Sequence, residues 1–210
     1  MMKTLTTLLI GSLLFTGSIN MGGYSIGDKA IDFNLKNVDG KMVSMEANPE
    51  NKGYLVIFTC NTCPYSIAYE DRIIELHNRY ASKGFPVIAI NPNDPTAQPD
   101  DSFEKMQQKA KEKEFPFPYL FDTNQEITLA YGATNTPHVY VVEKEGSDYF
   151  VRYIGAIDNN SRDASAATKK YVEAAVDALL TGKEVSTTST KAIGCTIKWS
   201  AANKNKRQEG

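Results

Sequence analysis

The sequence predicts an α/β domain in which a central mixed β-sheet is flanked by helices and preceded by an N-terminal β-hairpin. Continuous apolar runs at 54–59 and 85–91 are typical of strands buried on both faces, and helical periodicity follows each of them. Two short segments of alternating polarity meet at the turn signal Asp39-Gly40, which predicts the hairpin, and a second hairpin is expected at 138–157. This order of elements places helices on both faces of one sheet.

Four helices are expected, at 64–82, 101–113, 124–131 and 165–180. In the first, apolar residues recur about every 3.6 residues, Pro64 suits the first turn, and Gly84 is a plausible end. The second begins at Asp101-Ser102-Phe103-Glu104, which has the pattern of a capping box. The third is stopped by Gly132.

Composition and charge exclude several classes of protein. The 210-residue chain has 41% hydrophobic and 23% charged residues, which argues against disorder and against a membrane bundle. A formal net charge of -2 gives no reason to expect nucleic acid as a partner. Three cysteines do not make a disulfide scaffold, so the hydrophobic core must hold the fold together.

The N-terminus has the pattern of a secretory signal. A short basic start, Met1-Met2-Lys3, precedes an uncharged apolar stretch that is shorter than the roughly 20 residues of a transmembrane helix. We expect residues 1–20 to be a signal peptide. The mature protein would then be exported to the periplasm or another extracytoplasmic compartment, with no stable membrane span after cleavage. An uncleaved N-terminal anchor is the alternative.

One domain is expected over residues 21–182, followed by a C-terminal extension over 183–210. We expect Trp199 to anchor this extension on the domain. The string Thr187-Thr188-Ser189-Thr190 is typical of a linker, and the polar, basic end from Ala201 is expected to be mobile.

The most informative motif is Cys60-Asn61-Thr62-Cys63, which lies between an apolar strand and the first helix. A helix N-terminus presents unpaired N–H groups and partial positive charge, and both stabilise a thiolate, the reactive form of cysteine. At this spacing one thiolate can attack a foreign disulfide while the other cysteine resolves the mixed disulfide. These residues therefore indicate a redox site, with an inert structural disulfide as the alternative.

A second element is Thr136-Pro137, directly before the apolar strand that starts at His138. Proline cannot donate to a β-ladder, so at a strand entry it marks a turn, an edge or a cis peptide bond. A cis bond here would expose the backbone of Thr136 as a docking edge for an extended peptide. The sequence alone leaves the cis and trans forms open.

Together these elements resemble the thioredoxin superfamily, in which a C-x-x-C on a strand–helix turn is followed by a Thr-Pro, a hairpin and a terminal helix. More closely, the region from Met21 to Leu180 is similar to the AhpC/TSA-like branch, which includes peroxiredoxin-like and TlpA/ResA-like thiol-disulfide proteins. The opening Gly27-Asp28-Lys29-Ala30-Ile31-Asp32-Phe33 resembles the start of that branch's hairpin. The late Gly194-Cys195-Thr196-Ile197-Lys198-Trp199 resembles a segment of one peroxiredoxin-like subgroup.

The resemblance implies a thioredoxin-like fold and a thiol-disulfide oxidoreductase that acts on disulfides or dithiols of exported proteins. It makes Cys60 the exposed nucleophile and Cys63 the buried resolving cysteine, with Pro137 as a facing cis-proline and Thr136 supplying backbone contacts to substrate. The position of Cys60 just before the helix also predicts a depressed pKa. An upstream protein dithiol would act as electron donor and recycle the site, and neither a metal nor an organic cofactor is required.

Two other activities stay open. Peroxiredoxins carry P-x-x-x-T-x-x-C with a catalytic arginine, but Thr59 lies four residues before Cys63, not three, and Arg152 is the only obvious later arginine in the core. A peroxiredoxin-like thiol peroxidase is therefore an alternative that departs from this pattern. A copper-binding protein is another, because the cysteines and His138 offer ligands for Cu(I), although copper-delivery members of the fold space their cysteines one residue wider.

The remaining candidate residues have plainer interpretations. His138 is expected at a strand edge, and His77, Glu70 and Asp71 on the exposed surface of the first helix. Cys195 is either a packed, small apolar residue or a third thiol that pairs between molecules, and we favour packing.

Overall fold

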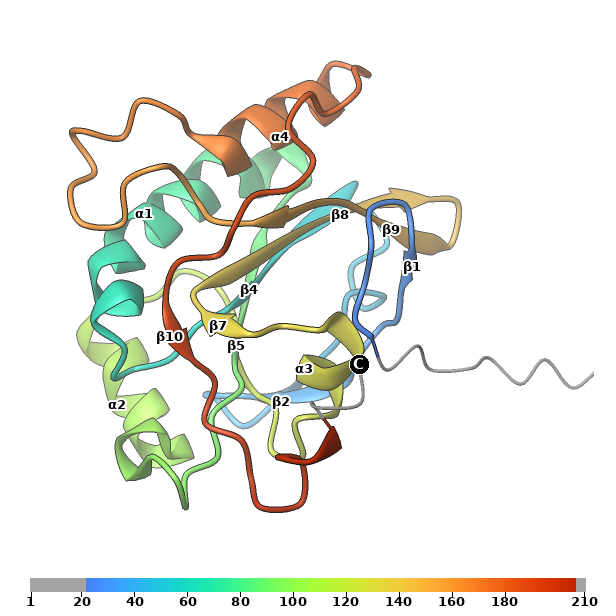
Figure 1. Ribbon diagram of the computed structural model, residues 1–210. Helices are drawn as coiled ribbons and strands as arrows, with labels where there is room; N and C mark the ends of the chain where they lie inside the picture. The colour runs from blue at the N-terminus through green and yellow to red at the C-terminus, as the bar shows by residue number, and fades with distance from the viewer. Residues whose placement is uncertain (1–21, 207–210) are drawn as a thin grey trace, which may run out of the picture.

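The computed structural model describes residues 22–206, so the expected signal peptide over 1–20 lies outside the described residues. One sheet runs in the order β1-β9-β8-β4-β5-β6-β2-β3, and β10 pairs with β7 apart from it (Figure 1). The strands are β1 (Lys29–Ala30), β2 (Leu35–Asn37), β3 (Met42–Val43), β4 (Gly53–Phe58), β5 (Val87–Asn91), β6 (Tyr119–Phe121), β7 (Asn135–Thr136), β8 (His138–Glu145), β9 (Asp148–Gly155) and β10 (Cys195–Thr196). The helices are α1 (Pro64–Tyr80), α2 (Phe103–Glu112), α3 (Glu126–Tyr131) and α4 (Tyr171–Leu180), with 3-10 turns η1 (Ala81–Lys83) and η2 (Pro99–Asp101).

The sheet is mixed, as the sequence predicts. β4 runs parallel to β5 and β5 parallel to β6, whereas β8 pairs antiparallel with both β4 and β9. The predicted hairpin forms from β2 and β3, and Gly40 in its turn has a φ of 87°, which a residue without Cβ adopts readily. The second predicted hairpin is β8–β9. The α/β fold class is therefore confirmed.

Two hydrophobic cores lie on the two faces of the sheet. Leu55 and Ile57 of β4 belong to the core that α1, α2 and α4 cover, whereas Val56 and Phe58 belong to the core beneath α3 and the C-terminal segment (Figure 1). This alternation follows from the pleat, which points successive side chains to opposite faces. Each fully buried large apolar side chain contributes about 1.5–3 kcal/mol. All three cysteines are free thiols, so these cores hold the fold without a cross-link.

The helix α4 begins at Tyr171, not at 165 as the periodicity predicts. The backbone just before it is paired elsewhere: the N–H of Lys169 donates to Oδ1 of Asn159 at 3.0 Å, and the Lys169 carbonyl accepts from the Asn159 N–H at 3.0 Å. These two bonds hold the chain out of the helix until this point.

The predicted capping box at the start of α2 does not form. Ser102 is the N-cap residue, and its side chain makes no capping hydrogen bond. The carboxylate of Asp101 instead accepts hydrogen bonds from Asn61 and Thr62, in the turn that is described below. A local pattern was thus overridden by a tertiary contact.

After α4 the chain returns across the end of the sheet (red in Figure 1), and we call residues 187–206 the C-terminal strap. Its first residues, predicted to be a linker, run beside β9. The N–H of Ile154 donates to the Thr188 carbonyl at 3.0 Å, and the N–H of Thr190 donates back to the Ile154 carbonyl at 3.0 Å. Further on, Trp199 is 7% exposed and packs in the second core.

The end of the strap also contacts the domain. Gln125 is 1% exposed, donates to the Lys198 carbonyl at 2.9 Å and accepts from the Ser200 N–H at 3.0 Å. Asn203 is buried and donates to the Asn124 carbonyl at 2.9 Å. The expected mobile tail therefore lies against the domain at Asn203.

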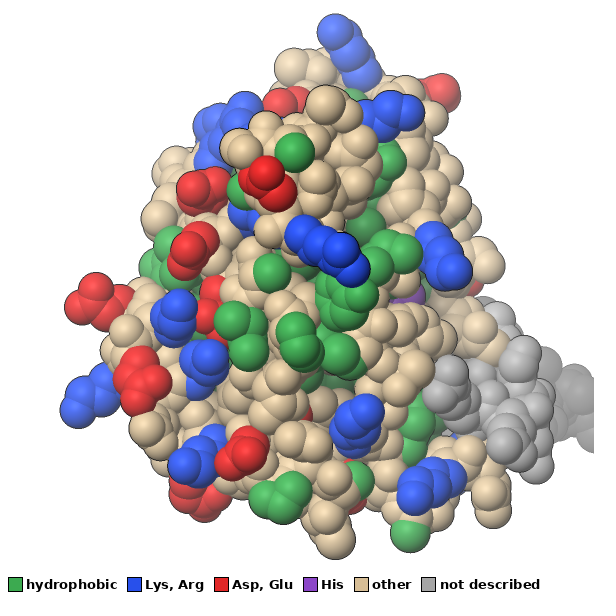
Figure 2. All heavy atoms as spheres, turned by 60° about the vertical axis from the view of Figure 1, so that its left-hand side comes forward, with side chains coloured by type: hydrophobic (Ala, Val, Ile, Leu, Met, Phe, Trp, Pro, Cys, Tyr) green, Lys and Arg blue, Asp and Glu red, His purple; other side chains and the backbone are tan. Residues whose placement is uncertain are grey.

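Charged side chains of both signs are interspersed over the face that Figure 2 brings forward, with apolar side chains between them. This mixture agrees with the small net charge of -2. Within residues 22–206, no helix has both the length and the apolar character that a membrane span requires.

Candidate active site

Cys60 and Cys63 lie on the turn that joins β4 to α1. Cys63 is the N-cap residue of α1, with an extended backbone at φ -68° and ψ 123°. Pro64 follows at the start of the helix, where its missing N–H has no cost. The 17-residue helix therefore directs its positive N-terminal end at Cys63.

The roles that the resemblance implies for the two cysteines do not match this geometry. Cys60 is not exposed: Cys60 is 4% and Cys63 3% exposed. Two turn residues, Asn61 and Thr62, separate Cys60 from Cys63, the N-cap residue. The thiol at the N-cap position of α1 is that of Cys63, and the backbone N–H of Ser66 lowers its pKa.

Hydrogen bonding and burial move the pKa values of the two thiols in opposite directions. A hydrogen bond with the Cys60 thiol lowers the pKa of Cys63 against the effect of burial, aided by the Cys195 thiol and the backbone N–H groups of Ser66 and Cys195. The same bond, burial and the negative charge of Asp101 raise the pKa of Cys60. These directions are opposite to the depressed pKa that the position of Cys60 before the helix predicts.

Thr136 brings the loop before β8 into contact with both cysteines. The Thr136–Pro137 bond is cis. Thr136 Oγ1 lies 3.2 Å from Sγ of Cys60, and the Cys63 thiol donates to the Thr136 carbonyl oxygen at 3.1 Å. The docking edge expected here is not free, because Thr136 is 1% exposed and pairs with Cys195 of β10. The strap of the same chain fills it.

Cys195 lies directly against Cys63. Its N–H donates to Sγ of Cys63 at 3.3 Å. Gly194 permits this approach, because a Cβ at that position would lie 2.1 Å from the Thr136 carbonyl oxygen. Burial and the Cys63 sulfur raise the pKa of Cys195 to about 11. Cys195, for which we favour packing, is thus partly exposed and lies beside Cys63.

A buried carboxylate holds the turn between the cysteines. Asp101 is 0% exposed, and its Oδ1 accepts from the N–H of Asn61 at 2.7 Å. Its Oδ2 accepts from the Thr62 hydroxyl at 3.0 Å and from the Asn93 side-chain amide at 2.6 Å. The sequence offers no signal for this role, because an aspartate just before a helix has a sufficient local explanation as a cap.

The other candidate site residues do not contact the cysteines. His138 begins β8 and is buried; its Nδ1 accepts from the Thr134 N–H at 3.3 Å, and burial lowers its pKa to about 4. Among residues 22–206, no group of three or more His, Cys, Asp and Glu side chains is arranged to hold a metal ion.

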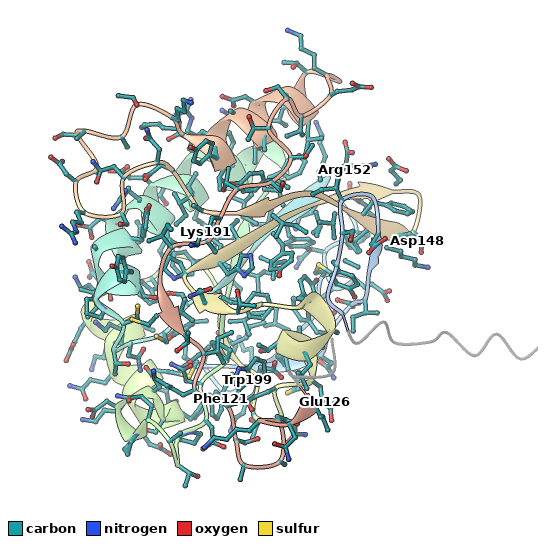
Figure 3. All side chains as sticks on the ribbon, in the orientation of Figure 1. Phe121, Glu126, Asp148, Arg152, Lys191 and Trp199 are labelled. Atoms are coloured by element: carbon teal, nitrogen blue, oxygen red, sulfur yellow. The ribbon has the colours of Figure 1, made fainter. Side chains whose placement is uncertain are left out.

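Arg152 lies on β9 (Figure 3) and does not supply the arginine of the peroxidase pattern. Its guanidinium pairs with Glu143 at 2.8 Å and with Glu145, both on β8. These contacts engage the arginine in the β8–β9 hairpin and involve neither Cys60 nor Cys63.

Two predictions about the surface of α1 are wrong. Glu70 is 5% exposed, and its carboxylate pairs with Lys109 of α2 at 2.9 Å. His77 is half-buried, and its Nδ1 accepts from the Val87 N–H at 3.3 Å. Asp71 is exposed, as predicted.

A buried ion pair on α1 was not predicted. Arg72 pairs with Asp158 at 2.6 Å and donates to the Asn160 carbonyl at 2.6 Å. Its guanidinium lies 3.7 Å from the centroid of the Tyr69 ring, and the Tyr69 hydroxyl donates to Asp158 at 2.8 Å. This cluster ties α1, the helix that begins at Cys63, to the segment after β9.

A dithiol on a strand–helix turn, beside a cis-proline loop and on a central mixed sheet, defines a thioredoxin-like protein. The AhpC/TSA family model matches residues 26–153, and the chain belongs to this family. Among solved structures the chain is similar to an uncharacterised conserved protein from Geobacillus kaustophilus, with 36% identity and a TM-score of 0.78 over 84% of this chain and 93% of that one. A thioredoxin-family thiol:disulfide interchange protein from Chlorobium tepidum TLS has 20% identity and a TM-score of 0.52, over 67% of this chain and 93% of that one, which shows the fold alone.

Among curated proteins the chain is similar to the thiol-disulfide oxidoreductase ResA of Bacillus thuringiensis subsp. konkukian (strain 97-27). The two are 25% identical over 124 residues, which is 58% of this chain and 65% of ResA. The chain thus matches slightly less than two thirds of that relative's length. The resemblance to the AhpC/TSA-like branch and the thioredoxin-like fold are both confirmed.

Proposed function

We propose that this protein is a thiol-disulfide oxidoreductase in which Cys63 is the attacking thiolate and Cys60 the resolving thiol. The observation that carries the proposal is the position of Cys63 at the N-terminus of α1, where its sulfur accepts from the Cys195 N–H at 3.3 Å. The helix N-terminus and the N–H of Cys195 would stabilise the anion that Cys63 forms when its thiol gives up the proton that it donates to the Thr136 carbonyl, while Cys60 stays protonated. Disulfide reduction needs this combination of a nucleophile and an adjacent resolving thiol.

The reaction consists of two exchange steps. The Cys63 thiolate attacks one sulfur of a substrate disulfide, so that a Cys63–substrate bond forms, the substrate S–S bond breaks, and the leaving thiolate takes a proton from water. Cys60 then loses its proton and attacks Sγ of Cys63, and the second substrate sulfur leaves and takes up that proton. The substrate gains two electrons, and the Cys60–Cys63 disulfide is later reduced by an upstream dithiol. These steps require no metal or organic cofactor.

The substrates we propose are disulfides of exported proteins in the periplasm or another extracytoplasmic compartment. The signal-like N-terminus and the named activity of ResA support this proposal. Exposed apolar side chains near the cysteines support a protein as substrate. Ile67, in the first turn of α1, is 45% exposed, and Ile193, two residues before Cys195, is 43% exposed. Both offer apolar contact area that a protein partner would bury.

The first test measures the redox equilibrium of the full chain against glutathione buffers, with free thiols alkylated and counted by mass. We expect a reversible two-electron couple on Cys60 and Cys63, with a potential between about -270 and -120 mV, the range of dithiol catalysts. A bridge that resists reduction beyond about -300 mV would indicate a structural disulfide and overturn the proposal.

Matched variants test the two roles. In a chain that carries Cys195→Ser, the further change Cys60→Ser should trap glutathione as a mixed disulfide on Cys63. The change Cys63→Ser in the same background should trap none, because the attacking sulfur is missing. A mixed disulfide on Cys60 in the second variant, with none in the first, would restore Cys60 as the nucleophile.

A further inference from the structure

We infer that Cys195 is a third redox thiol of this site, which forms a disulfide with Cys63 and connects the buried cysteine pair to external thiols. The inference rests on the proposed function and extends the site from two thiols to three. Three features of the strap carry it: its contact with Cys63, its anchoring, and its exposure.

The contact follows from the pairing of β10 with β7. The register places Cys195 opposite Thr136, the residue whose carbonyl oxygen lies 3.1 Å from Sγ of Cys63. The N–H of Cys195 donates to that same sulfur at 3.3 Å. The Asn135 side-chain amide donates to the Gly194 carbonyl at 2.9 Å and so fixes the strap at the residue before Cys195. In thiol exchange, Cys195 therefore occupies the position that a substrate cysteine on this edge would take.

The strap is anchored on both sides of Cys195. Before it, Thr190 Oγ1 accepts from the Ala156 N–H at 3.0 Å. After it, the N–H of Lys198 donates to Oδ1 of Asn93 at 2.8 Å. Because both anchors lie within a few residues of β10, the Cys195–Cys63 contact is a positioned feature of the fold.

Exposure distinguishes Cys195 from the other two cysteines. Cys60 and Cys63 are buried, at 4% and 3% exposed, whereas Cys195 is partly exposed. A thiolate must reach the sulfur that it attacks, so access limits exchange. Of the three cysteines, Cys195 is the most open to an external thiol.

The transfer from the buried pair to Cys195 is a balanced exchange. Starting from the Cys60–Cys63 disulfide, Cys195 loses its proton and attacks Sγ of Cys63. The Cys63–Cys195 bond forms, the Cys60–Cys63 bond breaks, and Cys60 leaves and takes up the proton. The protein neither gains nor loses electrons in this step.

An external dithiol then reduces the site through Cys195. Its thiolate attacks Sγ of Cys195, the Cys63–Cys195 bond breaks, and Cys63 leaves as a thiolate. A leaving thiol of low pKa departs faster, so Cys63 is the better leaving group of the two. The second thiol of the dithiol then attacks its partner sulfur in the mixed disulfide and releases Cys195 as a thiol. The dithiol is oxidised by two electrons, and all three cysteines are reduced.

The test uses the full chain with Cys60→Ser and glutathione disulfide as the probe. Trypsin leaves Cys60 and Cys63 together in the peptide 53–72 and Cys195 alone in the peptide 192–198. We expect non-reducing digestion of monomeric protein to give these two peptides joined by a disulfide. The matched control, Cys60→Ser with Cys195→Ser, should lose the joined pair and keep glutathione on Cys63.

Two results would overturn the inference: glutathione retained on Cys63 in Cys60→Ser with no joined peptides, or joined peptides found only in covalent dimers. Partially oxidised wild-type protein should also give a fraction of the joined pair, so the test does not depend on the folding of one variant. Failure of the proposed function is scored separately. If the proposed function is wrong, the Cys195→Ser variant will form no reversible Cys60–Cys63 disulfide. If only this inference is wrong, the Cys195→Ser variant will still form that disulfide.

Discussion

The carboxylate of Asp101 accepts a 2.7 Å hydrogen bond from the backbone N–H of Asn61, between the two cysteines of the C-x-x-C turn. The hydroxyl of Thr62 donates to the other carboxylate oxygen at 3.0 Å. Both residues between Cys60 and Cys63 are thus tied to one buried group on η2, far along the chain. A residue outside the C-x-x-C motif therefore holds the turn that positions the two cysteines.

The change Asp101→Asn tests this support. One acceptor oxygen becomes an NH₂ group that faces other donors, so the free energy of unfolding should fall by about 1–3 kcal/mol, the cost of an unsatisfied buried polar group. Urea unfolding of the reduced protein measures it. The pKa of Cys60 should also fall, because the Asp101 charge raises it. Asp100→Asn is the control, since Asp100 is exposed and contacts Asn61 through its backbone carbonyl. Equal stability of the two variants would contradict the assignment.

The Cys63 thiolate should persist below the pH range of ordinary thiols. Ultraviolet absorbance of the thiolate in reduced protein measures its titration, and Cys195, with a pKa of about 11, titrates separately. Since the folded pKa lies below the ordinary 9.0, this group's contribution to stability is complete above pH 9.0 and is lost as the pH falls toward the folded pKa.

The hydrogen bond from Cys60 is the first cause of this shift, and two variants isolate it. Cys60→Ala removes the donor, so the Cys63 titration should move to higher pH. Cys60→Ser keeps a hydroxyl donor and should shift the Cys63 titration by a smaller amount. A titration curve in Cys60→Ala that matches the wild type would show that the thiolate has another source of stabilisation.

The buried ion pair of α1 should contribute strongly to stability. The side chains of Arg72 and Asp158 are 10% and 3% exposed, so Arg72→Met leaves a buried carboxylate without its cation. Removal of one partner from such a pair costs about 3–5 kcal/mol, which denaturant unfolding measures. Arg152→Met is the control, because the pairs of Arg152 are more exposed and each is worth about 0–1 kcal/mol. Similar losses in both variants would argue against a special role for the Arg72 cluster.

Gly194→Ala should move the strap away from β7. The added Cβ would lie 2.1 Å from the Thr136 carbonyl oxygen, a backbone atom that cannot turn aside. Trp199 is the single tryptophan of the chain and lies buried in the strap (Figure 3), so its fluorescence should shift toward that of a solvated indole. Ile193→Ala changes an exposed neighbour and should leave the spectrum unchanged. An unshifted spectrum in Gly194→Ala would mean that the strap tolerates the larger residue in place.

Interactions between residues close in the chain made much of this protein predictable. The continuous apolar run of β4 requires burial on both faces, and Asp39-Gly40 favours a tight turn, so the sheet and its hairpin follow from local pattern. The same holds for the place of the cysteines, because a strand that leads into a helix through Cys63-Pro64 puts thiols at a helix N-terminus. The motif and the family could therefore be identified from the sequence alone.

Only the tertiary structure decided how the surroundings of the two cysteines differ and what covers them. The sequence places both cysteines near the helix, but the turn makes Cys63 the N-cap, and the charge of Asp101 bears on Cys60. The third thiol, Cys195, is 132 residues from Cys63 along the chain, and only the pairing of β10 with β7 brings it there. The pKa of a buried thiol depends on every charge and donor within a few ångströms. Around these cysteines the groups come from four separate segments of the chain. No pattern of neighbouring residues in the sequence predicts that these segments lie together.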